Sequence, residues 1–177
     1  MITLHVVSSI DGYIARHDNT VSWLADPGSV YESGVVPTAE EMAAFVSAID
    51  CYVLGAKTYK HALELGWPYG DTPTIVLTRR QLTSERKNVE FVSGDLRELA
   101  ERLRQKYTNI WVGGGAMLCQ EFLKQGLADE IRLTVAPVVL GGGLRLFDGE
   151  MAETRWSLKN VTAYRNGFVE LRYAARS

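Results

Sequence analysis

The pattern of apolar and polar positions predicts strands and helices that alternate along most of the chain. Short runs of branched apolar residues, bounded by turn residues, are typical of buried strands. Such runs occupy residues 1–8, 52–54, 74–78, 89–92, 110–112 and 130–137. Between them, apolar residues three and four positions apart predict helices at 39–49, from about 57 onward, from 95 to about 106, and at 115–125.

Local signals define several ends of these elements. Thr38 and Glu41 have the spacing of a capping box at the start of the first helix. Residues 15–37 are polar and irregular, and so long a loop in a compact domain is usually functional. Two late strand-like segments, 155–164 and 167–174, flank an Asn-Gly pair that is typical of a tight hairpin.

These elements together predict the fold class and the architecture. Alternating strands and helices are typical of an α/β fold in which helices cover both faces of an open sheet. We therefore expect a single domain over residues 1–177 with three αβα layers. The sheet should be twisted and mostly parallel, with an antiparallel hairpin at its C-terminal edge.

Composition excludes several classes of function. The 177 residues carry a net charge of −2, and no basic stripe with interleaved aromatic residues suggests nucleic acid as a partner. No apolar stretch approaches the roughly 18 residues of a membrane span. Cys51 and Cys119 form no CxxC pair and are expected as buried, reduced thiols of a cytoplasmic protein. No cluster of His, Cys, Asp or Glu has metal-ligand spacing, so we predict no metal.

The three consecutive glycines Gly113, Gly114 and Gly115 follow a predicted strand and precede a predicted helix. They match neither a G-x-G-x-x-G fingerprint nor a P-loop. One interpretation is a tight turn between strand and helix. The other is a pyrophosphate bound by backbone N–H groups at the start of the helix, where the helix dipole contributes about half a positive charge.

Two further strand ends favour the second interpretation. Gly55, Lys57 and Thr58 combine a glycine, a cation and a hydroxyl at the end of one strand, and Thr78 and Arg79 end another. Because the carboxyl ends of parallel strands meet at the same edge of a sheet, these groups should lie together. Backbone donors, hydroxyls and cations are what a dinucleotide phosphate needs.

Five ordered motifs give the chain a family resemblance. They are SSIDGYIA at 8–15, LGAKTY at 54–59, VLTR at 76–79, WVGGGAMLCQEFL at 111–123 and GLADEIRLTVAPVVLGGGLRLF at 126–147. With these motifs the whole chain resembles the dihydrofolate reductase-like superfamily. Within that superfamily it resembles the C-terminal reductase domain of riboflavin biosynthesis enzymes, the RibD C-terminal family.

The resemblance implies that NADPH binds along the carboxyl edge of the sheet. It implies phosphate contacts at Gly114, Gly115 and Ala116, with Lys57 and Thr58 opposite. Thr78 and Arg79 should hold the adenosine 2′-phosphate, while the backbone of Val7 and Ile14 holds the nicotinamide. The full set of implied cofactor residues is Val7, Ile14, Gly55, Lys57, Thr58, Thr78, Arg79, Gly113, Gly114, Gly115, Ala116 and Met117.

The resemblance also implies catalytic residues. Glu41 falls on the family's single acid, and Thr134 falls on the threonine that hydrogen-bonds to this acid. A second interpretation of Glu41 is a carboxylate that only caps its helix. Trp23 matches a tryptophan lining the substrate pocket, within a mobile loop at 15–24. His5 would lie near the pocket, where it could donate to a carbonyl or imine or serve as a structural histidine.

Three departures from the family pattern leave the substrate open. Ala56 replaces a phosphate-binding arginine, His5 replaces a lysine of the riboflavin enzymes, and Thr72 stands where dihydrofolate reductases carry an arginine for the folate tail. We expect an NADPH-dependent reductase similar to 5-amino-6-(5-phosphoribosylamino)uracil reductase. The alternatives are a dihydrofolate or pterin reductase and a non-catalytic NADPH-binding module. The resemblance further implies a homodimer.

Overall fold

The computed structural model describes residues 1–176. The strands are β1 (Ile2–Ser8), β2 (Tyr13–Ala15), β3 (Cys51–Gly55), β4 (Thr74–Leu77), β5 (Val89–Val92), β6 (Ile110–Val112), β7 (Glu130–Val135), β8 (Leu144–Arg145), β9 (Trp156–Ala163) and β10 (Val169–Ala175). The helices are α1 (Ala39–Ser47), α2 (Ala56–Glu64), α3 (Leu96–Lys106) and α4 (Ala116–Lys124), with a 3-10 turn η1 (Ser22–Leu24).

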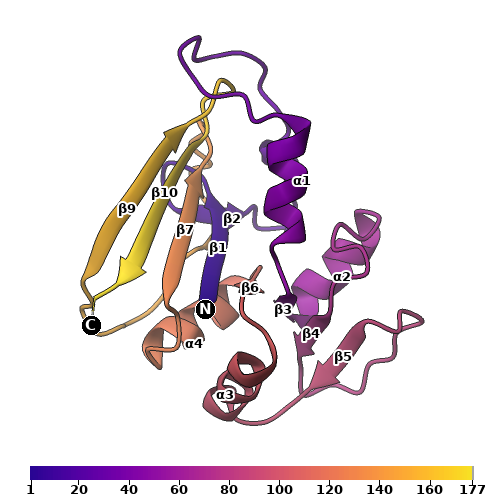
Figure 1. The fold of residues 1–177 in the computed structure, drawn as a ribbon. Coiled ribbons are helices and arrows are strands. Elements are labelled where there is room, and N and C mark those ends of the chain that lie inside the picture. The colour runs from indigo at the N-terminus through magenta and orange to yellow at the C-terminus, as the bar shows by residue number, and fades with distance from the viewer. Residues whose placement is uncertain (177) are drawn as a thin grey trace.

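Eight strands form one sheet in the order β5-β4-β3-β6-β1-β7-β10-β9. The first six strands in this order pair in parallel, whereas β10 runs antiparallel to both β7 and β9. Figure 1 shows the hairpin of β9 and β10 at one edge of the sheet. The predicted α/β fold, with its mostly parallel sheet and antiparallel C-terminal hairpin, is confirmed.

One face of the sheet carries the main apolar core. Alternate residues of the central strands, such as Leu4, Val53 and Val112, point to this face and are almost fully buried. They pack against the apolar stripes of α3 and α4, which include Leu103 and Phe122. Cys51 and Cys119 belong to this core as free, buried thiols.

The other face is covered by α1 and α2 and is rich in aromatic side chains. Tyr59 of α2 packs with Trp67 and Val76, while Phe45 of α1 packs near Tyr52 and Trp111. No residue of α1 is buried, because the helix rests on the sheet mainly through Phe45. The layer of α1 is thus much looser than the layer of α3 and α4 on the opposite face.

Three short elements, namely β2, β8 and the turn η1, were not predicted. β2 pairs antiparallel with β8 in a small second sheet. The turn η1 lies inside the segment expected to be irregular. Elements of two or three residues are too short to show a hydrophobic period, and β2 and β8 are stabilised by pairing between residues about 130 positions apart.

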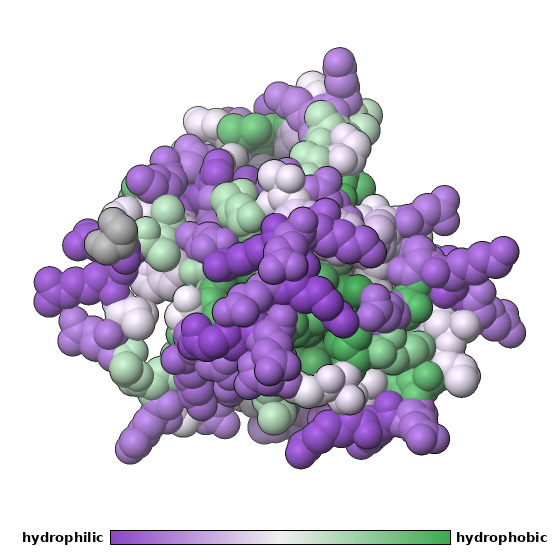
Figure 2. Space-filling view, turned by 60° about the horizontal axis from the view of Figure 1, so that its bottom comes forward, coloured by the Kyte–Doolittle hydropathy of each residue, from purple (hydrophilic) through white to green (hydrophobic). Residues whose placement is uncertain are grey.

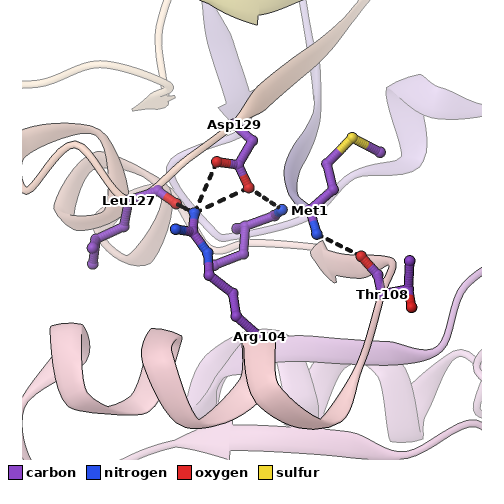
Figure 3. A network of polar contacts seen from close by, with 6 residues as sticks. Met1, Arg104, Thr108, Leu127 and Asp129 are labelled. Carbon is purple, nitrogen blue, oxygen red and sulfur yellow. Dashed lines mark hydrogen bonds and ion pairs between the residues drawn. The ribbon is translucent and has the colours of Figure 1, made fainter. Parts of the chain in front are cut away.

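Asp129 ties the N-terminus into the fold (Figure 3). Its Oδ2 accepts a hydrogen bond from the backbone N–H of Ile2 at 2.6 Å, and both of its oxygens lie within 3.0 Å of Arg104 Nη2. Arg104 also donates to the carbonyl of Leu127, and the terminal amine of Met1 donates to the carbonyl of Thr108. These contacts fasten the start of β1 between β6 and β7.

The outer surface of the layer formed by α3 and α4 is largely hydrophilic (Figure 2), in contrast to the apolar core beneath it. The lower side of the molecule in Figure 1 carries α3, α4 and both chain ends. Brought forward in Figure 2, this side shows many hydrophilic residues with hydrophobic surface between them. Within residues 1–176, no helix is long and apolar enough to cross a membrane.

Candidate functional site

The structure places Gly113, Gly114 and Gly115 against Gly55 at the carboxyl edge of the sheet. The backbone N–H of Gly55 donates to the carbonyl of Gly114 at 2.9 Å. A Cβ on Gly55 would lie 3.6 Å from the nitrogen of Gly115, and one on Gly113 would lie 3.2 Å from Leu54. Gly114 has a φ of 104°, which favours glycine. The two strand ends therefore approach each other through bare backbone.

Two helices begin at this glycine junction without a capping side chain. The N-cap residues are Gly55 for α2 and Gly115 for α4, and neither can accept the free N–H groups of the first turn. By contrast, Thr38 and Asp95 cap α1 and α3 through their side-chain oxygens. The N-termini of α2 and α4 thus offer free donors and positive dipole ends at one place.

Polar and cationic side chains from neighbouring elements surround the junction. The Oγ1 of Thr58 would lie 3.4 Å from a Cβ on Gly115, so the hydroxyl faces the start of α4. Lys57 is exposed in the first turn of α2. Thr78 and Arg79 follow β4, where the Thr78 hydroxyl accepts from the Arg80 N–H and the Arg79 side chain is exposed. This donor set suits a phosphate or another anion.

The remaining predicted cofactor residues frame the same edge. Val7 lies near the end of β1, partly exposed, and Ile14 lies in β2 beside it. Ala116 and Met117 occupy the first turn of α4, where the Met117 side chain is 85% exposed. Trp23 is buried in η1, and its Nε1 has no hydrogen-bond partner within the described residues.

Asp11 fastens the loop after β1 to the glycine-rich segment that follows β7. Its carboxylate accepts hydrogen bonds from Ser9 Oγ at 2.6 Å and from the backbone N–H groups of Leu140 and Gly141 at 3.0 and 2.8 Å. These bonds, with that of Ser9 the largest cause, lower the pKa of Asp11 to about 2. The contact holds the loop after Val7 against the glycine-rich segment. Because the pKa of Asp11 is about 2, its carboxylate stays ionised at neutral pH.

His5 lies on the α1 face of the sheet within an aromatic cluster. Its ring packs edge-on against Trp111 with centroids 4.7 Å apart, and Phe45 packs on the same indole at 4.8 Å. Burial and the nearby Arg132 guanidinium lower the pKa of His5 from 6.5 to about 4. The imidazole is therefore neutral at physiological pH and can donate or accept one hydrogen bond.

A charged network beside His5 was missed by sequence reasoning. Arg132 lies directly opposite His5 in the register of β1 and β7, and its guanidinium carbon stands 4.8 Å from the Phe45 ring centroid. Its Nη2 pairs with Glu170 at 3.2 Å, while Glu130 pairs with Arg172 at 2.7 Å. Alternation within β7 was the signal available, because Glu130, Arg132 and Thr134 share one face.

Glu41 lies in the first turn of α1, whereas Thr134 lies on β7. Glu41 completes the capping box: its Oε2 accepts from the Thr38 N–H at 2.7 Å, and its own N–H donates to the Thr38 hydroxyl. These hydrogen bonds lower the pKa of the exposed Glu41 carboxyl. Thr134 lies on β7 opposite Val7 and Glu170. The hydrogen bonds of Glu41 are therefore those of a helix cap, and no hydrogen bond joins its carboxylate to Thr134.

Comparison with known proteins identifies the family of the chain. A model of the RibD C-terminal domain matches residues 1–169. Bacillus subtilis YwjB is 34% identical over 173 residues, which cover 96% of this chain and 95% of that protein. A candidate riboflavin biosynthesis protein from Shewanella sp. PV-4 has a TM-score of 0.82 at 26% identity, with 99% of each chain covered.

A more distant solved structure shows the shared fold. Dihydrofolate reductase from Enterococcus faecalis, complexed with NADP(H) and RAB-propyl, has a TM-score of 0.66 at 16% identity. The superposition covers 100% of this chain and 97% of the reductase. The match of the family model over nearly the whole length, together with the relative at 34% identity, settles the family. The chain belongs to the RibD C-terminal domain family.

Proposed function

We propose that the protein is a reductase that binds NADPH and catalyses hydride transfer to a small molecule. The observation that carries this proposal is the junction of Gly55 and Gly113–Gly115, where α2 and α4 begin without side-chain caps. A Cβ on Gly115 would lie 3.4 Å from the Thr58 hydroxyl, so a side chain there would fill the space between this hydroxyl and the start of α4. A pyrophosphate satisfies free N–H groups at such a place without the need of a cation.

The donor set around the junction fits the rest of the cofactor. The phosphates would rest on Gly114, Gly115, Ala116 and Met117, with Lys57 and Thr58 facing them across the junction. The 2′-phosphate would lie against Thr78 and Arg79, whose guanidinium can hold two phosphate oxygens at once. The backbone of Val7 and Ile14 would position the nicotinamide, which supplies the hydride when bound.

The protein would orient the substrate over the α1 face of the sheet. Neutral His5 would donate a hydrogen bond to the accepting group, and Trp23 would close the pocket from the loop. Glu41 and Thr134 remain candidates for proton delivery, although Glu41 would first have to leave its capping bond. Such general acid catalysis typically contributes about 10²–10⁴-fold to a rate.

The substrate class follows from the family. We propose a small heterocycle or a carbonyl or imine compound, similar to 5-amino-6-(5-phosphoribosylamino)uracil. A homodimer is part of the same proposal, because pairing is implied by the family resemblance. Dihydrofolate is a second candidate, but its glutamate tail needs a cation, and the segment 61–78 contains neither Lys nor Arg.

Substrate-dependent oxidation of NADPH tests the proposal. The purified protein is mixed with NADPH and each of three compounds: 5-amino-6-(5-phosphoribosylamino)uracil, dihydrofolate and a simple cyclic imine. We expect loss of NADPH absorbance with a heterocycle or imine, and less efficient turnover of dihydrofolate than the roughly 10⁴ M⁻¹s⁻¹ typical at the low end for enzymes. Saturable NADPH binding without turnover of any compound would favour the non-catalytic module.

A further inference from the structure

The hydroxyl of Tyr69 lies beside the glycine junction at the carboxyl edge of the sheet. Tyr69 belongs to the loop that joins α2 to β4 (Figure 1). Its Oη would lie 3.7 Å from a Cβ on Gly113, and this Cβ would otherwise meet the Leu54 side chain at 3.2 Å. Because Gly113 has no side chain, a bound molecule can reach the Tyr69 hydroxyl across bare backbone.

Hydrogen bonds and aromatic packing hold the loop that carries Tyr69. Trp67 has a φ of 61°, in the left-handed region, and its indole is buried. The Nε1 of Trp67 donates to the carbonyl of Gly70 at 2.8 Å. From outside the loop, the Asn88 side chain donates to the carbonyls of Gly70 and Thr72 at 3.2 and 2.9 Å. Tyr69 is thus presented from a backbone that is fastened on both sides.

Aromatic neighbours fix the ring of Tyr69 and leave its hydroxyl able to donate. The ring packs against Tyr52 with centroids 4.5 Å apart, and edge-on against Trp67 at 5.3 Å. Burial, followed by the nearby Tyr52 hydroxyl, raises the pKa of Tyr69 to about 12, and no hydrogen bond within residues 1–176 contributes to this change. The phenol is therefore uncharged at physiological pH and can donate one hydrogen bond to a ligand.

The strand order places the Tyr69 hydroxyl between two parts of the proposed cofactor. Four parallel strands that end at this edge are neighbours in the order β4-β3-β6-β1. The proposed function has the 2′-phosphate after β4, the pyrophosphate at the start of α4 and the nicotinamide beside β1. Gly113 directly follows β6, one residue before the proposed phosphate contacts, and β1 is the next strand. A dinucleotide in this order brings to Gly113 the ribose that joins its pyrophosphate to its nicotinamide.

On the basis of the proposed function, we propose that the Tyr69 hydroxyl binds the nicotinamide ribose of the cofactor. Ribose hydroxyls can accept the phenolic O–H and can donate to its oxygen, so a neutral tyrosine fits them in either direction. Arg79 follows β4, which lies two strands and about 10 Å from β6. Tyr69 therefore adds affinity for the nicotinamide half of the cofactor, and Arg79 adds affinity for the adenosine half.

Binding of NADPH and of its adenosine half, adenosine 2′,5′-bisphosphate, tests the assignment. Calorimetry should show that Tyr69→Phe, which keeps the ring, weakens NADPH about three- to tenfold, as expected for one neutral hydrogen bond. The same variant should bind the bisphosphate as wild type does. Arg79→Ala should weaken both ligands. Tyr59→Phe is the matched control, because the Tyr59 ring also packs on Trp67, at 5.8 Å, and it should bind both ligands normally.

Three results would overturn the assignment and leave the proposed function standing. The first is equal affinity of wild type and Tyr69→Phe for NADPH, including the case in which only the KM of a reduced substrate rises, since the hydroxyl would then bind substrate. The second is an equal loss of NADPH and the bisphosphate in Tyr69→Phe, which would indicate a change of the whole edge. The third is an equal loss of NADPH in Tyr59→Phe, which would indicate aromatic packing. Absence of NADPH binding by folded wild type would refute the proposed function and the assignment together.

Discussion

At the scale of single residues, Arg79 carries the proposed preference for NADPH over NADH. The 2′-phosphate that distinguishes them is close to doubly charged at neutral pH, and Arg79 is exposed at the end of β4. A hydrogen bond between charged groups contributes about 1.5–3 kcal/mol, with exposed ones at the low end. Arg79→Ala should therefore weaken NADPH about tenfold and leave NADH nearly unchanged.

Titration of both cofactors against wild type, Arg79→Ala and Arg80→Ala measures this effect. The Arg80→Ala protein is the neighbouring control and should retain the preference. Because the contact is exposed to solvent, the preference of the wild type should also shrink as ionic strength rises. Equal losses of NADPH and NADH in Arg79→Ala would show that Arg79 is structural.

His5 gives the stability of the protein a pH dependence with a defined sign. Burial, followed by the Arg132 charge, lowers its pKa from 6.5 to about 4. Between these values the unfolded chain binds more protons, so the free energy of unfolding should fall as pH falls from about 6.5 to about 4. The full effect is at most about 3.5 kcal/mol, since the pKa falls by about 2.5, from 6.5 to about 4, and one pKa unit corresponds to about 1.4 kcal/mol.

Denaturant unfolding of wild type and His5→Phe at several pH values measures this contribution. Phenylalanine keeps an aromatic ring beside Trp111 but does not titrate. The difference in stability between the two proteins should change across that pH range and stay constant above it. Asp11, with its pKa of about 2, titrates below the range. Parallel pH curves for both proteins would contradict the assignment.

At the scale of elements, Asp129 connects β1, β7 and α3. It accepts the Ile2 N–H at 2.6 Å and pairs with Arg104 at 2.9 Å, while the two side chains are 42% and 39% exposed. Hydrogen bonds to a charged group are worth more than neutral ones, but this exposure weakens the ion pair. Asp129→Asn should thus lower the free energy of unfolding by about 1–2 kcal/mol.

The exposed pair of Arg155 and Glu153 provides the control. Their side chains are 77% and 81% exposed and lie 3.4 Å apart. Glu153→Gln should change stability by less than about 0.5 kcal/mol, because such surface pairs contribute little. Chemical denaturation midpoints report both changes. Equal effects of the two substitutions would mean that the network around the N-terminus adds no stability.

At the scale of the whole molecule, local patterns predicted the order of the main elements. Strands such as 89–92 and 110–112 have the predicted bounds, because short apolar runs between turn residues are local signals. The capping box of Thr38 and Glu41 was also readable from four neighbouring residues. The helices predicted from about 57 and from 115 begin at Ala56 and Ala116, within about one residue of the prediction, because a glycine follows each preceding strand.

The polar network on the α1 face could not be predicted in the same way. The pairs of Arg132 with Glu170 and of Glu130 with Arg172 depend on the register between β7 and β10. Partners in these pairs are about forty residues apart, and a slip of one position would reverse every side chain. The role of Glu41 was ambiguous because its position matched two local signals at once. One signal was the capping box with Thr38, and the other was the acidic residue of the family motif.

Equilibrium binding of NADPH tests the central claim of this account most directly. Trp111 lies in β6, two residues before Gly113, so titration should quench tryptophan fluorescence with saturation below millimolar NADPH. Gly115→Val places a side chain against the Thr58 hydroxyl at the start of α4 and should abolish or strongly weaken binding. Lys124→Ala, at the far end of α4, should bind normally. Absence of saturable binding by the folded wild type at millimolar NADPH, or normal binding by Gly115→Val, would contradict the account.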